Sequence, residues 1–302
     1  MKRNILYILF YLLCSMLILG CANVAPQLEL TGQFAERQQL GVVELDILDE
    51  ISGLAASQNN AGVLWAHNDS GDGSNIYAMT ETGQHLATFN VEGCWALDWE
   101  DIALGRGPKE GVDYLYIGDI GDNRAIRPFI QICRVAEPTI EQLQSGVPTL
   151  QGEVITLHYP GGARDAESLM VDAVNGLYIV TKREANVSVF FAPYPHSLTE
   201  SILLTEVAVL PLRWITAGDL SYDGQELLLK TSKKVFYWRR MPGESLVSML
   251  QRTPSMVKSY QKEVQGEAIA WARDAQGFYT ASEEVRGLEA KVNYYPRLNN
   301  KQ

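Results

Sequence analysis

The chain has 302 residues, of which 20% are charged, and a formal net charge of −11. That balance disfavours binding of nucleic acid or of an anionic membrane surface through the folded part, and it permits divalent cations as partners. The four histidines are scattered and no two cysteines have CxxC spacing, so the sequence offers no zinc site.

The first 20 residues are predicted to be a lipoprotein signal peptide. Two basic residues precede an apolar run over 5–19 that is short for a membrane span. Ile18-Leu-Gly-Cys21 is typical of a lipobox, whose cysteine is acylated and becomes the new N-terminus. We therefore expect residues 21–27 to be a lipidated tether and the lipid to be the only membrane attachment. The protein is expected in the cell envelope, on the periplasmic face of the outer membrane in a double-membraned bacterium. An uncleaved anchor or an ordinary signal peptide is the alternative.

A five-fold internal repeat runs through the remaining chain, residues 28–302. Each copy places a small or acidic pair before an aliphatic residue, and successive copies lie 48, 67, 51 and 49 residues apart. The five copies are Ser52-Gly-Leu54, Glu100-Asp-Ile102, Glu167-Ser-Leu169, Gly218-Asp-Leu220 and Glu267-Ala-Ile269.

A β-rich segment follows each copy of the repeat after a short turn, and further short segments follow in most copies. These second segments are 64–69, 114–119, 177–182, 227–231 and 278–283. Four short antiparallel strands in roughly 50 residues are typical of one propeller blade. The sequence therefore predicts an all-β fold, a single, monomeric five-bladed β-propeller over 28–302. A stretch at 28–33 or 42–47 is expected to complete the last blade and close the ring. A six-bladed propeller is the alternative.

Cys94 and Cys133 remain once the signal peptide and the lipid-bearing cysteine are set aside. In an oxidising compartment two such cysteines either form a disulfide or stay free, and the sequence leaves both alternatives open.

Equivalent residues of the five first strands face one another across the channel of a propeller. Glutamates that converge in this way repel one another unless they are protonated or neutralised. Calcium accepts an irregular ring of oxygen ligands. We expect one Ca²⁺ to be bound by Ser52, Glu100, Glu167, Asp219 and Glu267. The alternative is that these acids cap turns or pair with basic residues.

The ends of the second strands return to the face where the first strands begin, so the loops that follow them surround the channel mouth. The loops 68–73 and 118–124 are rich in Asp, Asn and Gly. The candidate ligand-binding residues for a small anionic ligand are His67, Asn68, Asp122, Arg124, Lys182 and Arg183. Asp69 and Asp119 are candidate catalytic bases.

At these motifs the chain resembles the calcium-dependent apyrases (calcium-activated nucleotidases), which are five-bladed propellers with one central calcium. The matching segments are Ser52-Gly-Leu54, Trp99-Glu100, Glu167-Ser168, Gly218-Asp219 and Glu267-Ala-Ile269. The chain departs from the family where Gly218 replaces a serine ligand, Ser70 a loop arginine, and Asp122-Asn123 a Lys-Glu pair. The resemblance therefore implies the metal ring more strongly than the nucleotide pocket. The HNDSGD and DIGDN motifs are also similar to those of exported bacterial propellers without an assigned activity.

Two functions follow from this interpretation. The first is calcium-assisted hydrolysis of a phosphoanhydride or phosphoester, with Asp69 or Asp119 as general base. The second is non-catalytic binding of an envelope protein or glycan, with a structural calcium. The number of Arg and Lys side chains that reach the mouth discriminates between them, because fewer than two would exclude nucleotide hydrolysis.

Overall fold

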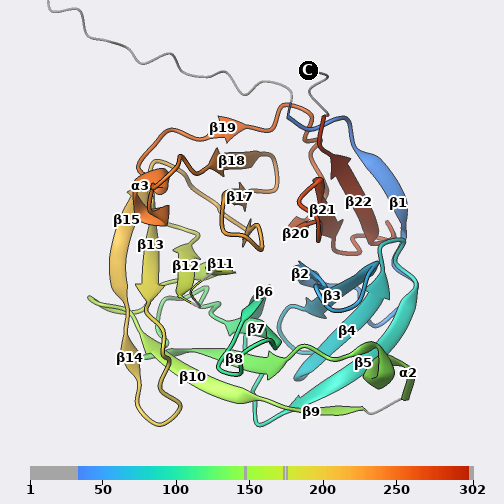
Figure 1. Ribbon diagram of the computed structural model, residues 1–302, viewed down its shortest axis with the longest axis horizontal. Coiled ribbons are helices and arrows are strands. Elements are labelled where there is room, and N and C mark those ends of the chain that lie inside the picture. The colour runs from blue at the N-terminus through green and yellow to red at the C-terminus, as the bar shows by residue number, and fades with distance from the viewer. Residues whose placement is uncertain (1–32, 146–147, 173, 175, 299–302) are drawn as a thin grey trace, which may run out of the picture. The chain divides into compact units, whose positions relative to one another are not determined.

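The computed structural model describes residues 33–145, 148–172, 174 and 176–298. The signal peptide, the lipobox with Cys21 and the tether 21–27 lie outside the described residues. The described residues form five sheets around a central axis (Figure 1). The first strand of each sheet contacts the first strands of the two neighbouring sheets, in a closed circle of five. The five-bladed propeller is thereby confirmed, and the six-bladed alternative was wrong.

The first two blades each carry a fifth strand that pairs in parallel with the outer edge. Blade 1 consists of β2 (Ile51–Ala56), β3 (Val63–Asn68), β4 (Asn75–Thr80), β5 (His85–Glu92) and β9 (Thr149–Gln151). Blade 2 consists of β6 (Trp99–Arg106), β7 (Asp113–Asp119), β8 (Ile130–Ala136), β10 (Glu153–His158) and β14 (Ile202–Leu203).

The other three blades have four antiparallel strands each. Blade 3 consists of β11 (Ala166–Val171), β12 (Leu177–Thr181), β13 (Val187–Ala192) and β15 (Thr205–Leu210). Blade 4 consists of β16 (Ala217–Leu220), β17 (Glu226–Lys230), β18 (Val235–Arg239) and β19 (Ser255–Met256). Blade 5 consists of β20 (Gly266–Trp271), β21 (Gly277–Ser282), β22 (Lys291–Pro296) and β1 (Gln38–Val42).

Two short helices, α2 (Ile140–Ser145) and α3 (Leu246–Leu250), lie in connections between strands. Within the described part of the chain, neither helix has the length and apolar character that a membrane crossing requires.

The ring closes through β1, which pairs antiparallel with β22, the last strand of the chain. A strand from the N-terminal part was expected to do this, but neither expected segment, 28–33 or 42–47, is that strand, since β1 precedes the second segment and shares only Val42 with it. Gln38 and Gln39 lie opposite Tyr294 and Asn293. The pairing covers the outer edge of blade 5 and ties the two ends of the propeller together.

The hydrophobic core lies between the blades and not within one sheet. One cluster packs Leu54 of blade 1 against Ala268 and Ala270 of blade 5, and another packs Trp65 of blade 1 against Ile102 of blade 2. Small alanines on β20 let the inner strands approach closely, while large aromatic residues fill the wider space farther from the axis.

Cys94 and Cys133 form a disulfide, which settles the alternative that the sequence left open. The bond joins the connection between blades 1 and 2 to β8 of blade 2, with 5.8 Å between the two Cα atoms. Both residues are buried. Gly152 packs directly on this bond, because a Cβ at residue 152 would lie 2.4 Å from the Cys94 Sγ.

Polar side chains of the first strands tie neighbouring blades together. The Asp101 carboxylate accepts hydrogen bonds from the backbone N–H of Leu169 in blade 3 (2.9 Å) and of Gly218 in blade 4 (3.4 Å). Its other oxygen accepts from Ile102 N–H at 2.9 Å. Asp101 is completely buried, so these N–H groups have no water to bond instead.

Asp101→Asn is expected to lower the free energy of unfolding by about 3 kcal/mol, because its NH₂ group faces backbone donors whichever way the amide turns. Urea unfolding of the variant measures this loss. Asp274→Asn is the matched control, since Asp274 accepts Gln276 N–H at 2.9 Å in an exposed hairpin turn. An equal effect of the two substitutions would contradict the inter-blade role of Asp101.

Candidate functional site

The first strands of four blades carry a β-bulge at the position predicted to line the channel. The pairing with the second strand skips one residue in each case, and the skipped residues are Ser52, Glu100, Glu167 and Glu267. A bulged residue is left out of the ladder, and its side chain is free to point away from the blade faces. The bulge therefore explains why a charged residue recurs inside strands that are otherwise buried.

Blade 4 lacks this bulge. The residue of blade 4 that is equivalent to the glutamates lies two positions earlier than the sequence alignment placed it. In blades 3, 4 and 5 the first hairpin closes through N–H groups of Asp172, Ser221 and Ala272. Five residues before these lie Glu167, Thr216 and Glu267, so Thr216, and not the Gly218-Asp219 pair, is equivalent to the glutamates. The Thr216 Oγ1 is buried and has no hydrogen-bond partner within the described part of the chain.

Two of the five predicted metal ligands make inter-blade hydrogen bonds. Asp219 accepts the backbone N–H of Trp271 in blade 5 at 2.7 Å. Ser52 Oγ donates to the carbonyl oxygen of Glu100 in blade 2 at 2.7 Å. Of the remaining three, Glu100 and Glu167 lie where carboxylates gather, and Glu267 belongs to neither of the groups found among the described residues.

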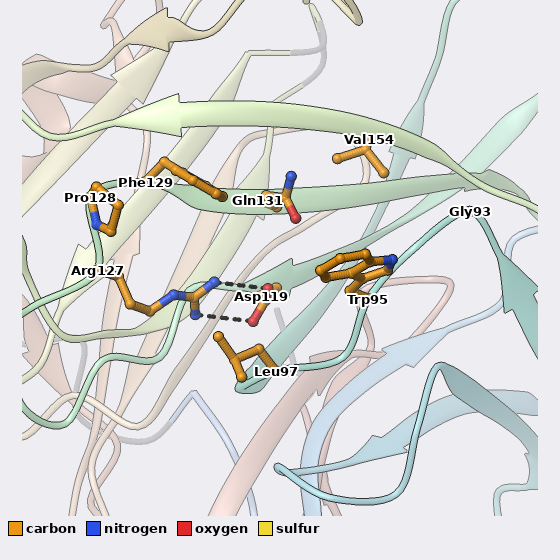
Figure 2. A pocket seen from close by; sticks show the side chains of 9 residues that line it. All are labelled: Gly93, Trp95, Leu97, Asp119, Arg127, Pro128, Phe129, Gln131 and Val154. Carbon is orange, nitrogen blue, oxygen red and sulfur yellow. Dashed lines mark hydrogen bonds and ion pairs between the residues drawn. The ribbon is translucent and has the colours of Figure 1, made fainter.

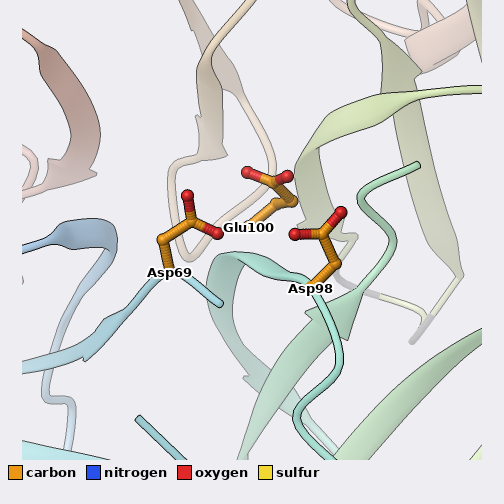
Figure 3. A group of neighbouring side chains, drawn as sticks. All are labelled: Asp69, Asp98 and Glu100. Atoms are coloured by element: carbon orange, nitrogen blue, oxygen red, sulfur yellow. The ribbon is translucent and has the colours of Figure 1, made fainter. Parts of the chain in front are cut away.

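Five carboxylates form two groups that share Glu100. Oxygens of Asp69, Asp98 and Glu100 lie within 4.8 Å of one another, as do oxygens of Glu100, Asp165 and Glu167. Figure 3 shows the first three carboxylates directed toward one another. Glu100, Asp165 and Glu167 are buried, and Asp69 and Asp98 are half-buried. The cluster thus joins residues of blades 1, 2 and 3 at one end of the channel.

The carboxylates at the centre of this cluster have few hydrogen-bond partners. Among the described residues, no hydrogen bond reaches the Glu100 carboxylate, and the buried Oε2 of Glu167 has no partner. Lys182 pairs with the other oxygen of Glu167. A buried carboxylate without donors is costly, so a bound cation would relieve both groups.

The loop between β7 and β8 shapes the cluster through its DIGDN motif. A Cβ at Gly121 would lie 2.3 Å from Glu100 Oε1 and 2.5 Å from Asp98 Cγ, so only glycine fits there. Asp122 N–H donates to Asp165 at 2.9 Å, and Asp119 accepts Asp98 N–H at 2.8 Å. The motif therefore holds Asp165 and Asp98 in place through these two hydrogen bonds.

Burial and mutual repulsion raise the pKa values of the acidic residues at the mouth. Burial, then the charges of Asp69 and Asp98, raises the pKa of Glu100 well above its usual range. Burial, with Asp69 next, raises the pKa of Asp98 to about 6. Burial, followed by the charge of Glu267, raises the pKa of Glu283 to about 8. Without a cation, these groups hold protons at pH values where free carboxyls are ionised.

The metal-free protein is expected to lose stability as the pH rises from about 4 to about 8. The folded state holds protons on Asp98 and Glu283 more tightly than the unfolded chain does, where ordinary pKa values of 3.8 and 4.5 apply. Stability is therefore lost as the pH rises through the folded pKa values, up to about 6 for Asp98 and about 8 for Glu283, and the loss levels off above them. Urea unfolding in chelator at several pH values measures the slope. Glu283→Gln should flatten its upper part, and an unchanged slope in that variant would contradict the assignment.

Three basic side chains lie beside the carboxylate cluster, and each is already paired with an acid. Lys182 pairs with Glu167, and Arg183 pairs with Asp165 and also contacts Asn123. Arg127, which the sequence did not single out, binds Asp119 through two hydrogen bonds of 3.0 and 2.8 Å. The number of basic side chains passes the threshold of two, but none of these three is left over for a phosphate at the cluster.

The other predicted ligand-binding residues serve the loops themselves or lie in solvent. Asn68 accepts Glu50 N–H and donates to Ile47 O, and Asp122 accepts the N–H groups of Ile126 and Arg127. Arg124 is exposed and forms no ion pair within the described residues.

His67 lies inside blade 1 and not at the surface of the mouth. The side chain is fully buried, with its ring edge-on to Trp99 at 5.6 Å. Its Nδ1 lies 2.7 Å from Asn68 O. Burial lowers the pKa of His67 to about 4, so the ring is neutral at physiological pH.

A separate pocket of about 580 Å³ opens on the side of blade 2. Figure 2 shows Trp95 and Phe129 among the side chains that line it, together with the ion pair of Asp119 and Arg127. Trp95 is 82% exposed although its backbone is anchored, since Trp99 Nε1 donates to Trp95 O and the adjacent Cys94 is in the disulfide. Gln131 adds a side-chain amide to the lining. The pocket combines aromatic faces with a neutral pair of opposite charges.

Comparisons with known proteins show no family for this chain. No family model matches it, and no curated protein matches it. The RRP9 WD40 repeats align at 9% identity over 89% of this chain and 99% of theirs, with a TM-score of 0.44. A luciferin-regenerating enzyme aligns at 10% identity over 87% and 95%, with a TM-score of 0.47. A nidogen/laminin complex aligns at 14% identity over 78% and 73%, with a TM-score of 0.44. Function therefore has to be argued from the site.

Proposed function

We propose that the protein is a calcium-binding propeller, with one Ca²⁺ at the channel mouth between Glu100 and Glu167. The observation that carries this proposal is the pair of carboxylate groups that share the buried Glu100. All of the clustered donors are carboxylate oxygens, which suit a hard cation, and their irregular arrangement suits calcium better than the strict octahedron of magnesium. Glu100 and Glu167 of the predicted ring keep their role, and Asp69, Asp98 and Asp165 join them as candidate ligands, whereas Glu267 belongs to neither group.

The proposed ion would link three blades. Asp69 comes from blade 1, Asp98 and Glu100 from blade 2, and Asp165 and Glu167 from blade 3 or its entry. The ion would thereby hold the inner strands together at the end of the channel where the acids repel one another. Lys182 and Arg183 supply two positive charges to this cluster of five carboxylates, and Ca²⁺ would supply two more.

Terbium luminescence tests the site, because Tb³⁺ replaces Ca²⁺ in oxygen sites and is excited through nearby tryptophans. Tb³⁺ added to the metal-free protein is expected to emit on excitation of tryptophan, and excess Ca²⁺ should remove the emission. Glu100→Gln should abolish the signal, whereas Glu110→Gln, an exposed acid in the hairpin between β6 and β7, should not change it. Emission that is equal in all three proteins would contradict the proposal.

We infer that this calcium is structural and that the protein acts by binding. The resemblance to calcium-dependent apyrases makes phosphoanhydride hydrolysis the competing hypothesis, and Asp69 is its candidate base. Burial raises the pKa of Asp69, as a base near a metal requires. The pairing of Lys182, Arg183 and Arg127 with acids weighs against it. Calcium-dependent release of phosphate from ATP that is lost in Asp69→Asn would overturn the binding hypothesis.

The pocket at Trp95 supports a neutral glycan as the ligand. A sugar ring packs its C–H face on an aromatic side chain, and its hydroxyls need donors and acceptors together. Trp95 and Phe129 supply the faces, while Arg127, Asp119 and Gln131 supply both kinds of polar group without net charge. Quenching of Trp95 fluorescence by cellotetraose, maltotetraose or chitotetraose is expected. A response that is retained in Trp95→Ala, or absent with all three sugars, would contradict this ligand.

The membrane attachment is also part of the proposal. Cys21 is proposed to be acylated, which would place the propeller at the cell envelope. Cys21→Ser should abolish incorporation of labelled palmitate and release the protein from the membrane fraction. Continued labelling of that variant would contradict Cys21 as the lipid-bearing residue.

A further inference from the structure

The five loops that connect second and third strands at the channel mouth differ in charge. The loops of blades 1, 2 and 5 carry acids, such as Asp69, Asp119 and Glu283. The loop of blade 4 is Thr231-Ser-Lys-Lys234 and carries only positive charge. A pocket of about 500 Å³ lies beside it, lined by Arg213, Trp214, Lys233 and Lys234 among others. The mouth is therefore basic on one side although the chain has a net charge of −11.

The basic residues of this pocket lack acidic partners. None of its nine lining residues is an Asp or a Glu. Arg213, Lys233 and Lys234 are exposed, and within the described ranges none of them forms an ion pair. Three adjacent cations without acids repel one another, so an anion bound among them would be favoured.

Trp214 holds the arginines at the edge of the pocket. Its φ of 60° is in the left-handed region that non-glycine residues rarely adopt, and its N–H donates to Lys182 O at 2.8 Å. The Cζ of Arg213 lies 4.8 Å from the ring centroid, and that of Arg183 lies 5.7 Å from it. Backbone strain is often retained where it serves a binding site, and Trp214 combines strain with two guanidinium groups packed on its ring. We therefore expect a binding site next to Trp214.

The lysines are fixed by their own turn. The Thr231 Oγ1 accepts the backbone N–H groups of Lys233 (3.2 Å) and Lys234 (3.0 Å), and Thr231 N–H donates to Lys234 O at 2.8 Å. Because these hydrogen bonds fix the backbone of this short loop, both lysine side chains project from a single backbone conformation.

We propose that this pocket binds a small molecule that bears two or more phosphate or sulfate groups. Guanidinium forks bind tetrahedral oxoanions through paired hydrogen bonds, and lysines add point charges. Several separated cations suit a multivalent anion better than a single carboxylate. The site is distinct from the carboxylate cluster and needs no calcium.

Calorimetric titration in chelator tests this site with two probes, sodium tripolyphosphate for phosphate sources and sucrose octasulfate for sulfate sources. At least one probe is expected to bind, with affinity that falls as salt increases. The double variant Lys233→Gln/Lys234→Gln should weaken binding at least tenfold. Trp214→Gly keeps the backbone conformation and all the cations, yet it should weaken binding several-fold, because it frees the two arginines.

The matched control is Lys109→Gln/Arg273→Gln, which removes the same charge from exposed hairpin turns at the opposite ends of the first strands. It should bind the probe as the parent does. Failure of both probes to bind would overturn the proposal, as would equal losses in the control and in the lysine double variant. The two outcomes leave the calcium proposal untouched, since no calcium is present in the titration.

Discussion

Saturating calcium is expected to raise the free energy of unfolding of the metal-free protein by about 4 kcal/mol when free calcium exceeds Kd a thousandfold. The folded protein concentrates Glu100, Glu167 and the neighbouring acids, and the unfolded chain does not, so the ion binds the folded state selectively. Urea unfolding with calcium and with chelator measures the difference. Magnesium at the same excess should stabilise less, because it demands an octahedral set of ligands.

Glu167→Gln separates this expectation from a purely structural role of the acids. The amide keeps the size of the side chain and one oxygen but removes the charge and the pairing with Lys182. If calcium binds there, the variant should lose most of the calcium response while it remains folded in chelator. A loss of stability that is the same with and without calcium would show that the glutamate only supports the fold.

Removal of the disulfide by Cys94→Ala/Cys133→Ala is expected to lower the free energy of unfolding by about 4 kcal/mol, the loop-closure value for residues 39 apart. The bond restricts the unfolded chain across the junction of blades 1 and 2. It also packs against Gly152, so its loss leaves a space in the core. The urea midpoint of the double variant, compared with that of the oxidised parent, measures the effect. A midpoint within error of the oxidised parent would contradict a stabilising bond.

The propeller could be predicted from sequence because each blade repeats one apolar strand after an acidic or small residue. The closing strand could be expected but not located. Gln38–Val42 has a weak strand pattern of its own, and the free edge of β22 decides its pairing. The disulfide depended on which strands come together, which spacing between two cysteines does not define.

The site was predicted in part for a related reason. Glu100, Glu167 and Glu267 stood out because the bulge repeats, but Thr216 was missed. The sequence alignment matched Leu220 to the aliphatic residue two positions after each glutamate. In the structure Leu220 instead corresponds to the residue four positions after the glutamate, which lies on the same strand face. Asp98 and Asp165 could have been identified from the sequence, because each lies two residues before a glutamate of the predicted ring. Arg213 and Trp214 had none, since they meet Lys233 and Lys234 only in the folded chain.

Calorimetric titration of calcium into the metal-free propeller tests the central claim most directly. We expect one ion per chain in the parent protein, with release of protons from the carboxyls whose pKa values are raised, so that the heat depends on the ionisation enthalpy of the buffer. Glu100→Gln should remove the binding, because Glu100 belongs to both carboxylate groups. Absence of calcium binding in the parent, or binding of the same strength in Glu100→Gln, would contradict the claim.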